Sequence, residues 1–208
     1  MELSNVITSL KTLHQLNYLK RSGWLLRGVP QDICESVATH CYSAAKAGFH
    51  YTQDLPLTTM LLVHDWPEAI SGDPTPHDKI DPRIKHQREY EAMQFITKPL
   101  PYGDGLMNIW LEYEHKNTPR AQLAHQLDKL DAGVKALFYE HLGFNVSEFY
   151  PYTLEKLTDP VLVEIFETLL ERNHNLLDSH RIYFKMLAER SEERRVGKEC
   201  RSRWSPYH

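Results

Sequence analysis

Apolar side chains recur at steps of three and four residues through most of this chain, which is the spacing of one face of a helix. The pattern is plainest between residues 121 and 142, at Leu123, Leu127, Leu130, Val134 and Leu137. No stretch alternates apolar and polar residues as a strand does, and only nine of the 208 residues are glycine. Helix-favouring residues such as Leu, Ala, Glu and Lys are plentiful. The sequence therefore predicts an all-α fold, a single compact helical bundle.

Capping residues and prolines indicate where the helices begin and end. Ser36 or Asp32 is expected to cap a helix that runs from about residue 33 to residue 49. Pro67 disfavours helical geometry at the residue before it, so the helix over 54–65 is expected to kink or stop there. The remaining helices are expected at 7–20, 83–97, 106–116, 121–142 and 160–189.

Length and composition are those of one soluble globular domain. With 41% hydrophobic and 25% charged residues, the chain is long enough for one core and too short for two comfortable domains. We expect one domain over residues 1–190. The last stretch, SEERRVGKECRSRWSPYH (191–208), resembles a translated cloning tail and is expected to be non-native. The alternative is a natural basic tail.

Several classes of protein are disfavoured by charge and hydropathy. The net charge is −4 and no basic stripe is present, so a nucleic-acid partner is not expected. No apolar run reaches the roughly 20 residues that span a bilayer, and the N-terminus lacks the pattern of a secretory signal. The three cysteines, Cys34, Cys41 and Cys200, fit neither a zinc spacing nor a disulfide framework. The expected location is the cytoplasm, without a membrane partner.

The segment that says most about function is LLVHDWPEAISGDPTP, residues 61–76. Its apolar start brings His64 and Asp65 side by side, and the carboxylates of Glu68 and Asp73 follow. An ionised Asp at the end of a buried segment is costly unless its lost hydration is compensated, and a metal ion compensates it directly. The segment therefore predicts a metal site with further carboxylates nearby.

Two more candidate ligands lie far away in the sequence. His40 is on the apolar face of its predicted helix, so its side chain is expected to point inward. Asp128 and Asp131 are close together in another predicted helix, and one is expected to face inward while the other is solvated. Inward polar groups are best satisfied together by one divalent ion. The expected ligands are His40, His64, Asp65 and Asp128.

This ligand set mixes nitrogen and oxygen donors and contains no thiolate. A structural zinc cage is therefore disfavoured, whereas Mn²⁺, Co²⁺, Mg²⁺, Fe²⁺ or Zn²⁺ can each be accommodated. Four protein ligands on an octahedral ion leave two positions for a water and a substrate oxygen, which suits metal-activated hydrolysis. Most of the other histidines, His125 among them, stand in polar contexts and are expected at the surface.

The order and spacing of these residues resemble those of the HD-domain metal-dependent phosphohydrolases, in particular the small helical 5′-deoxynucleotidases. The resemblance covers about residues 15–145. It rests on KRSGW (20–24), ESVATH (35–40), VHDWPEAISGDPTP (63–76), WLEYE (110–114) and QLDKLDAGVKALFYE (126–140). The implied fold is an HD-domain helical bundle, and the implied metal set is the one proposed above. One departure is Pro67 within HDWPE, which bears on the orientation of Glu68.

The resemblance also implies an activity, the hydrolysis of deoxyribonucleoside 5′-monophosphates to deoxyribonucleoside and phosphate. Glu68 and Asp73 are then the catalytic carboxylates, one acting on the water and the other on the leaving 5′ oxygen, and spacing does not decide between the two assignments. Arg21 and Trp24 correspond to residues that shape the nucleotide site. A homodimer is common among the similar proteins.

Three other hypotheses stay open. A related HD hydrolase acting on dNTPs or cyclic nucleotides would need a larger basic pocket than Arg21 and Lys79 suggest. A di-iron HD oxygenase would need additional histidine ligands, for which the candidates are His50, His77, His86 and His115. A non-catalytic helical adaptor would have little reason to retain Glu68 and Asp73.

Overall fold

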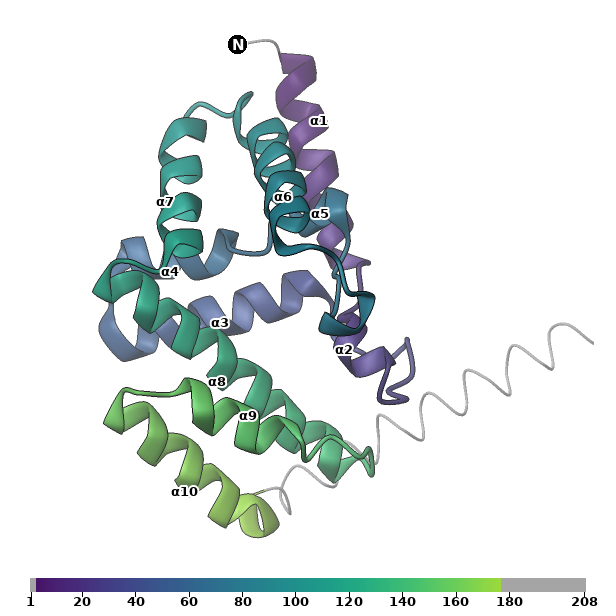
Figure 1. The fold of residues 1–208 in the computed structure, drawn as a ribbon, viewed down its shortest axis with the longest axis vertical. Coiled ribbons are helices and arrows are strands. Elements are labelled where there is room, and N and C mark those ends of the chain that lie inside the picture. The colour runs from purple at the N-terminus through teal and green to yellow at the C-terminus, as the bar shows by residue number, and fades with distance from the viewer. Residues whose placement is uncertain (1–2, 177–208) are drawn as a thin grey trace, which may run out of the picture. The chain divides into compact units, whose positions relative to one another are not determined.

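The computed structural model describes residues 3–176, which are helical with no strand among them (Figure 1). The helices are α1 (Leu3–His14), η1 (Gln15–Asn17), α2 (Ser22–Leu25), α3 (Val37–Thr52), α4 (Leu55–Val63), α5 (Glu68–Ser71), η2 (Pro76–Asp78), α6 (Pro82–Thr97), α7 (Gly103–His115), α8 (Pro119–His141), α9 (Phe149–Lys156) and α10 (Pro160–Leu176). The predicted all-α class is confirmed. The suspected tail at 191–208 and the end of the helix predicted over 160–189 lie outside the described residues.

The chain divides into two compact units, Met1–Phe166 and Glu167–His208, and α10 runs across the boundary between them. Everything described below belongs to the first unit. The extent of the domain over residues 1–190 stays a prediction. No helix in the described part of the chain has the length and apolar character needed to cross a membrane.

Capping side chains begin the three helices that carry most of the site. Ser36 Oγ accepts the backbone N–H of Thr39, so α3 begins at Val37 rather than near residue 33. Asp54 caps α4 in the same way, and Thr118 caps α8 with a proline in its first turn. Of the two caps considered for α3, Ser36 is therefore the one used.

The α-helix is interrupted by a turn at the HDWP sequence, where Pro67 predicted a kink or a stop. Helix α4 ends at Val63, residues 64–67 form a turn, and α5 starts directly at Glu68. The backbone N–H of Glu68 contacts the carbonyl of Asp65 within this turn. Because of this break, the side chains of His64, Asp65 and Glu68 do not follow the spacing of one continuous helix, and all three line the same pocket.

Helix α9 and the first helix also differ from the sequence-based expectation. No helix was predicted over residues 149–156, where Pro151 lies in the first turn of α9, a position at which a proline is tolerated. The first helix, expected over 7–20, ends at His14, and its apolar residues Ile7 and Leu10 are 43% and 57% exposed. Its one buried residue is Ser9, and the first buried apolar side chain is that of Leu16, in η1.

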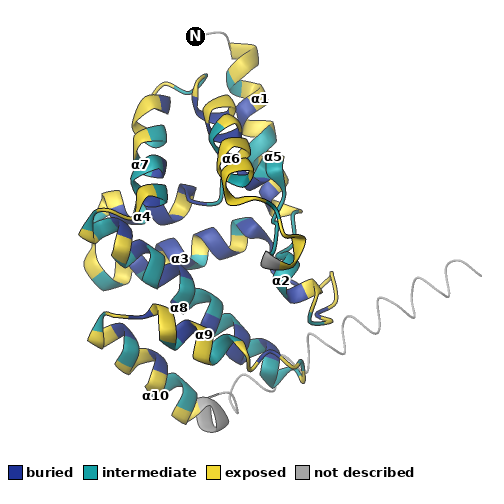
Figure 2. Cartoon of the chain, in the orientation of Figure 1, coloured by how far each residue is buried: buried dark blue, intermediate teal, exposed yellow. Residues whose placement is uncertain are grey.

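Helices α3, α4 and α8 approach one another closely around the site, and Figure 2 shows the buried residues along α3 and α8. A Cβ added at Gly48 of α3 would lie 2.5 Å from Leu61 Cδ1 of α4. A Cβ added at Gly133 of α8 would lie 2.7 Å from Thr153 Oγ1 and 2.8 Å from the Phe166 ring. Gly48 therefore permits the close approach of α3 and α4, and Gly133 permits the close approach of α8 to Thr153 and Phe166.

Candidate metal centre and substrate pocket

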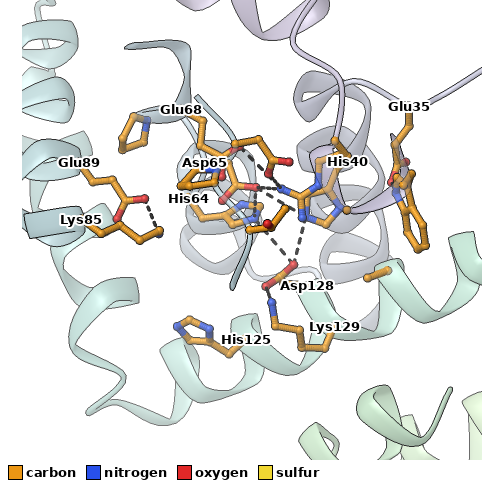
Figure 3. A pocket seen from close by; sticks show the side chains of 18 of the residues that line it. Glu35, His40, His64, Asp65, Glu68, Lys85, Glu89, His125, Asp128 and Lys129 are labelled. Atoms are coloured by element: carbon orange, nitrogen blue, oxygen red, sulfur yellow. Dashed lines mark hydrogen bonds and ion pairs between the residues drawn. The ribbon is translucent and has the colours of Figure 1, made fainter. Parts of the chain in front are cut away.

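Side chains from α3, α8 and the end of α4 converge on one point (Figure 3). One ligand atom from each of His40, His64 and Asp65 lies within 4.8 Å of the other two. Asp128 Oδ1 lies 3.1 Å from His40 Nε2 and 4.0 Å from His64 Nε2. The structure thus brings together the whole set of expected ligands, although they are widely separated in the sequence.

In each histidine ring, the hydrogen bond made by Nδ1 determines whether Nε2 is available as a metal ligand. His64 Nδ1 lies 2.7 Å from the carbonyl oxygen of Leu61, which can only accept, so Nδ1 carries the proton. His64 Nε2 is then a free acceptor, and it is buried without a hydrogen-bond partner among the described residues. His40 Nδ1 lies 2.8 Å from Asp131 Oδ2, which likewise leaves Nε2 facing the cluster. Two imidazole nitrogens and two carboxylates aimed at one point fit a divalent cation of mixed nitrogen and oxygen preference.

The expectation that either Asp128 or Asp131 would be solvated is wrong. Both face inward: Asp128 faces the cluster, and the Asp131 side chain, only 12% exposed, accepts a hydrogen bond from His40. The reason is that a buried imidazole has two nitrogens on opposite edges, and each needs a partner. Asp131 therefore holds the orientation of His40 from behind the metal centre.

Replacing Asp131 with asparagine is expected to weaken metal binding by about 10–100-fold, because the charged partner of a ligating imidazole is lost. The affinity is measured by competition with a coloured chelator. Asp104→Asn, at an exposed position in the first turn of α7, is the matched control and should bind metal normally. Equal affinity in the two variants would mean that Asp131 does not orient His40.

Asp128 is held by two residues that sequence analysis did not single out. Its second oxygen, Oδ2, accepts a hydrogen bond from Tyr113 Oη at 3.1 Å and lies 2.8 Å from Lys129 Nζ. Tyr113 is part of the WLEYE segment, but nothing in the sequence links it to Asp128 before α7 and α8 pack together. These contacts leave Oδ1 to face the two histidines.

The electrostatics of the cluster favour a cation. Burial raises the pKa of Asp128, but the nearby Lys129 and His40 outweigh burial and hold that pKa well below its usual range. Burial and the charge of Arg21 oppose protonation of His40, yet its hydrogen bonds to the two aspartates raise its pKa to about 9. Carboxylates held ionised and imidazoles that attract protons are satisfied together by a bound divalent ion.

Arg21 lies beside the metal centre within a group of carboxylates. Its Nη1 atom donates to Asp73 Oδ1 at 2.8 Å and to Asp65 Oδ2 at 3.1 Å, and lies 3.7 Å from Glu68 Oε2. The other oxygen of Asp73 accepts the backbone N–H of Ser22. Since both oxygens of Asp73 already accept hydrogen bonds, this geometry suits an anchor for Arg21 better than the catalytic carboxylate that the resemblance implied.

Glu68 differs from Asp73 in having an oxygen available. Its Oε2 atom is buried and has no hydrogen-bond partner within the described part of the chain. Burial and the neighbouring Asp65 carboxylate raise the pKa of Glu68 well above its usual value. Pro67 does not turn the side chain away, because Glu68 still lines the pocket. A buried carboxyl group that has a raised pKa and an oxygen without a hydrogen-bond partner is suited to accept and donate a proton.

Trp24 is packed into the core next to Arg21 and is only 3% exposed. Its ring centroid lies 4.3 Å from that of Phe149 and 5.1 Å from that of Tyr139, and its Nε1 donates to Glu35 Oε1 at 2.7 Å. The indole also lines the pocket. It therefore forms a fixed wall, and its exposure is too small for a freely accessible stacking platform.

A pocket of about 730 Å³ opens over the metal centre. In Figure 3, Lys85 and Glu89 lie on the opposite side of the cluster from Glu35. The surface position expected for His125 is wrong: it lines this pocket, stacked on Tyr113 with ring centroids 3.8 Å apart. Burial lowers the pKa of His125 to about 4, so its ring is neutral at ordinary pH.

The fold is that of an HD domain. The family model described as HD domain matches residues 13–166, and the chain belongs to this family. A Bos taurus protein named 5′-deoxynucleotidase HDDC2 is 33% identical over 183 residues, which cover 83% of this chain and 88% of that protein. A 5′-deoxynucleotidase of Saccharomyces cerevisiae is 30% identical, with 83% of this chain and 77% of that protein covered.

Solved structures have the same fold. A conserved hypothetical protein from Pyrococcus furiosus superimposes with a TM-score of 0.66 at 30% identity, covering 79% of this chain and 99% of that one. A protein from Magnetospirillum magnetotacticum, described as a predicted metal-dependent phosphohydrolase, superimposes with a TM-score of 0.62 at 22% identity, covering 82% and 92% of the two chains. The family predicted from the sequence is thereby confirmed.

Proposed function

We propose that this protein is a divalent-metal-dependent phosphomonoesterase that hydrolyses deoxyribonucleoside 5′-monophosphates to deoxyribonucleoside and phosphate. The observation that carries the proposal is the His64 Nε2 atom, buried without a partner among the described residues, next to Arg21 and Glu68 in one pocket. The relatives named 5′-deoxynucleotidase support this choice of substrate.

The proposed metal ligands are His40, His64, Asp65 and Asp128. A divalent ion held there would polarise a phosphoryl oxygen and lower the pKa of water. The donor set supports Mn²⁺, Co²⁺, Mg²⁺, Fe²⁺ or Zn²⁺. A cytoplasmic homodimer without a nucleic-acid or membrane partner remains a prediction.

The side chains around this centre have separate roles in substrate binding and proton transfer. Arg21 binds the phosphate, because a guanidinium matches phosphate oxygens with parallel N–H donors. Asp73 holds Arg21 in place. Glu68 takes a proton from the attacking water as the new P–O bond forms. Glu68 then donates this proton to the leaving 5′ oxygen as its bond to phosphorus breaks. One carboxyl group therefore accounts for both proton transfers.

The pocket favours a monophosphate over a triphosphate. Beyond Arg21, the cations in its lining are Arg27, Lys85, Lys116 and Lys129. Arg27, Lys85 and Lys129 are each paired with a carboxylate, at distances between 2.5 and 2.8 Å, whereas Lys116 has no ion pair among the described residues. Lys79, considered as a further cation from the sequence, is not among the lining residues. The additional phosphates of a triphosphate would therefore have to compete with carboxylates for most of these cations.

A di-iron centre has less support. Within residues 3–176, ligand atoms of three or more His, Cys, Asp or Glu side chains gather at one place, around His40, His64 and Asp65. Of the additional histidines considered, His77 lines the pocket but does not belong to that group. The arrangement therefore supports one metal-ligating cluster.

The function is tested by measuring phosphate release after the protein has been stripped with a chelator and reloaded with each candidate metal. The panel contains dNMPs, NMPs, dNTPs and cyclic nucleotides. We expect release from dNMPs by the reloaded protein and none by the stripped protein. Preferential hydrolysis of dNTPs or cyclic nucleotides would replace the proposed substrate, and no release with any metal would overturn the proposal.

A further inference from the structure

Glu35 contacts both residues assigned to substrate binding, although it takes no part in the chemistry proposed above. Its carbonyl oxygen accepts the backbone N–H of Arg21 at 3.1 Å, and its Oε1 accepts the indole N–H of Trp24 at 2.7 Å. Its own backbone N–H donates to Tyr139 Oη at 2.8 Å. One residue thus contacts the phosphate-binding arginine through its main chain and the pocket-wall tryptophan through its side chain.

The carboxylate of Glu35 is placed where a charge is costly. Its side chain is 2% exposed, and its Oε2 lies 3.1 Å from Lys135 Nζ on α8, an ion pair that lacks hydrogen-bond geometry. Burying such a pair contributes little to stability compared with an apolar pair of similar volume. Packing alone therefore does not account for a buried carboxylate at this position, whereas a need to fix the indole does.

The surrounding backbone ties the same two segments together. Lys20 Nζ donates to the carbonyl of Cys34 at 2.6 Å, and the N–H of Val37 donates to the carbonyl of Leu19 at 2.9 Å. The segment that carries Arg21 and Trp24 is therefore held against residues 34–37, at the start of α3. Helix α3 carries His40, so the substrate-binding segment is placed relative to the metal centre through this junction.

We propose that Glu35 is a positioning residue that determines nucleoside binding by fixing the Trp24 indole in the pocket wall. Lys135 holds the Glu35 carboxylate from α8, the helix that also carries Asp128. The backbone contact with Arg21 does not depend on the Glu35 side chain. Loss of the carboxylate therefore frees the indole while the phosphate-binding residue keeps its place. This inference rests on the proposed nucleotidase function.

The test separates the nucleoside end of the pocket from the phosphate end. Glu35→Leu removes the acceptor, Glu35→Gln keeps an acceptor oxygen without the charge, and Trp24→Phe removes the donor. Each variant is assayed, as the metal-loaded full chain, for KM and kcat with a dNMP, for the inhibition constant of inorganic phosphate, and for metal content. Glu112→Gln, whose partner Arg120 lies outside the pocket lining, is the control.

We expect Glu35→Leu to raise KM for the dNMP about tenfold, because substrate binding must then fix an indole that a hydrogen bond to a charged group held in place before. Glu35→Gln should raise KM less. The inhibition constant of phosphate and the metal content should stay unchanged, which a general loss of structure would not allow. In the Trp24→Phe background, Glu35→Gln should add no further increase, because the two changes break the same contact.

Several results would decide against the inference. If the wild-type protein is active and both Glu35→Gln and Trp24→Phe have the wild-type KM, this inference is overturned while the proposed function stands. Additive effects of the two changes in the double variant would have the same consequence. These two milder variants carry the test if Glu35→Leu does not fold. A wild-type protein that releases no phosphate from any dNMP would overturn the proposed function and this inference together.

Discussion

His64→Ala is expected to lose bound metal and with it all measurable phosphatase activity. His64 Nε2 is buried, faces the cluster, and has no alternative hydrogen-bond partner among the described residues. Its Nδ1 donates to the carbonyl of Leu61, so Nε2 is the nitrogen available to a metal ion. The backbone carbonyl of residue 64 still accepts the Trp110 indole N–H, observed at 3.2 Å, so the local fold should survive. Asp65→Ala should behave in the same way.

Metal content is measured on the dialysed protein, together with phosphate release from dNMPs. His86→Ala is the control, because His86 is on α6 with an exposed side chain and is outside the cluster. The control should keep its metal and its activity. A His64→Ala protein with stoichiometric metal and near-native turnover would show that the metal centre is misassigned.

Glu68→Gln is expected to lower kcat by about 10²–10⁴-fold, the usual contribution of a positioned acid or base. The amide keeps the size of the side chain but cannot take a proton from water. Metal content and KM should change little, because Glu68 is proposed to act on the water and not to bind the ion. Single-turnover rates at saturating dNMP measure the hydrolysis step directly.

Arg21→Ala and Asp73→Asn provide the contrast for this experiment. Both are expected to raise KM as well as lower kcat/KM, since Arg21 binds the phosphate and Asp73 holds Arg21. Glu155→Gln, on the exposed side of α9, should leave all constants unchanged. If Glu68→Gln alters only KM, or Arg21→Ala leaves kcat/KM untouched, the roles assigned to these side chains are wrong.

The helical class, the approximate positions of the longer helices and the family followed from the sequence alone. Periodicity, capping residues and prolines act locally, and a local signal is readable without a structure. The cap at Ser36, one of the two residues considered for that helix, and the break before Glu68 are of this kind. The expected metal ligands followed because their spacing matches that of a known family.

The partners behind those ligands were decided by packing. Asp131 against His40, Tyr113 against Asp128 and Glu35 against Trp24 are contacts between side chains that are distant in sequence or on different helices. Their geometry depends on how closely α3, α7 and α8 approach one another, and no local pattern encodes that distance.

Tertiary structure also distinguishes residues that looked equivalent in the sequence. Glu68 and Asp73 are both carboxylates close to His64, yet both oxygens of Asp73 accept hydrogen bonds, from Arg21 and the Ser22 N–H, while Glu68 Oε2 has no hydrogen-bond partner among the described residues. Composition and spacing specify which chemical groups are present and which helix carries them. Burial and the hydrogen bonds formed on folding determine whether a carboxyl anchors a neighbour or carries a proton, because both depend on groups that only the folded chain brings into contact.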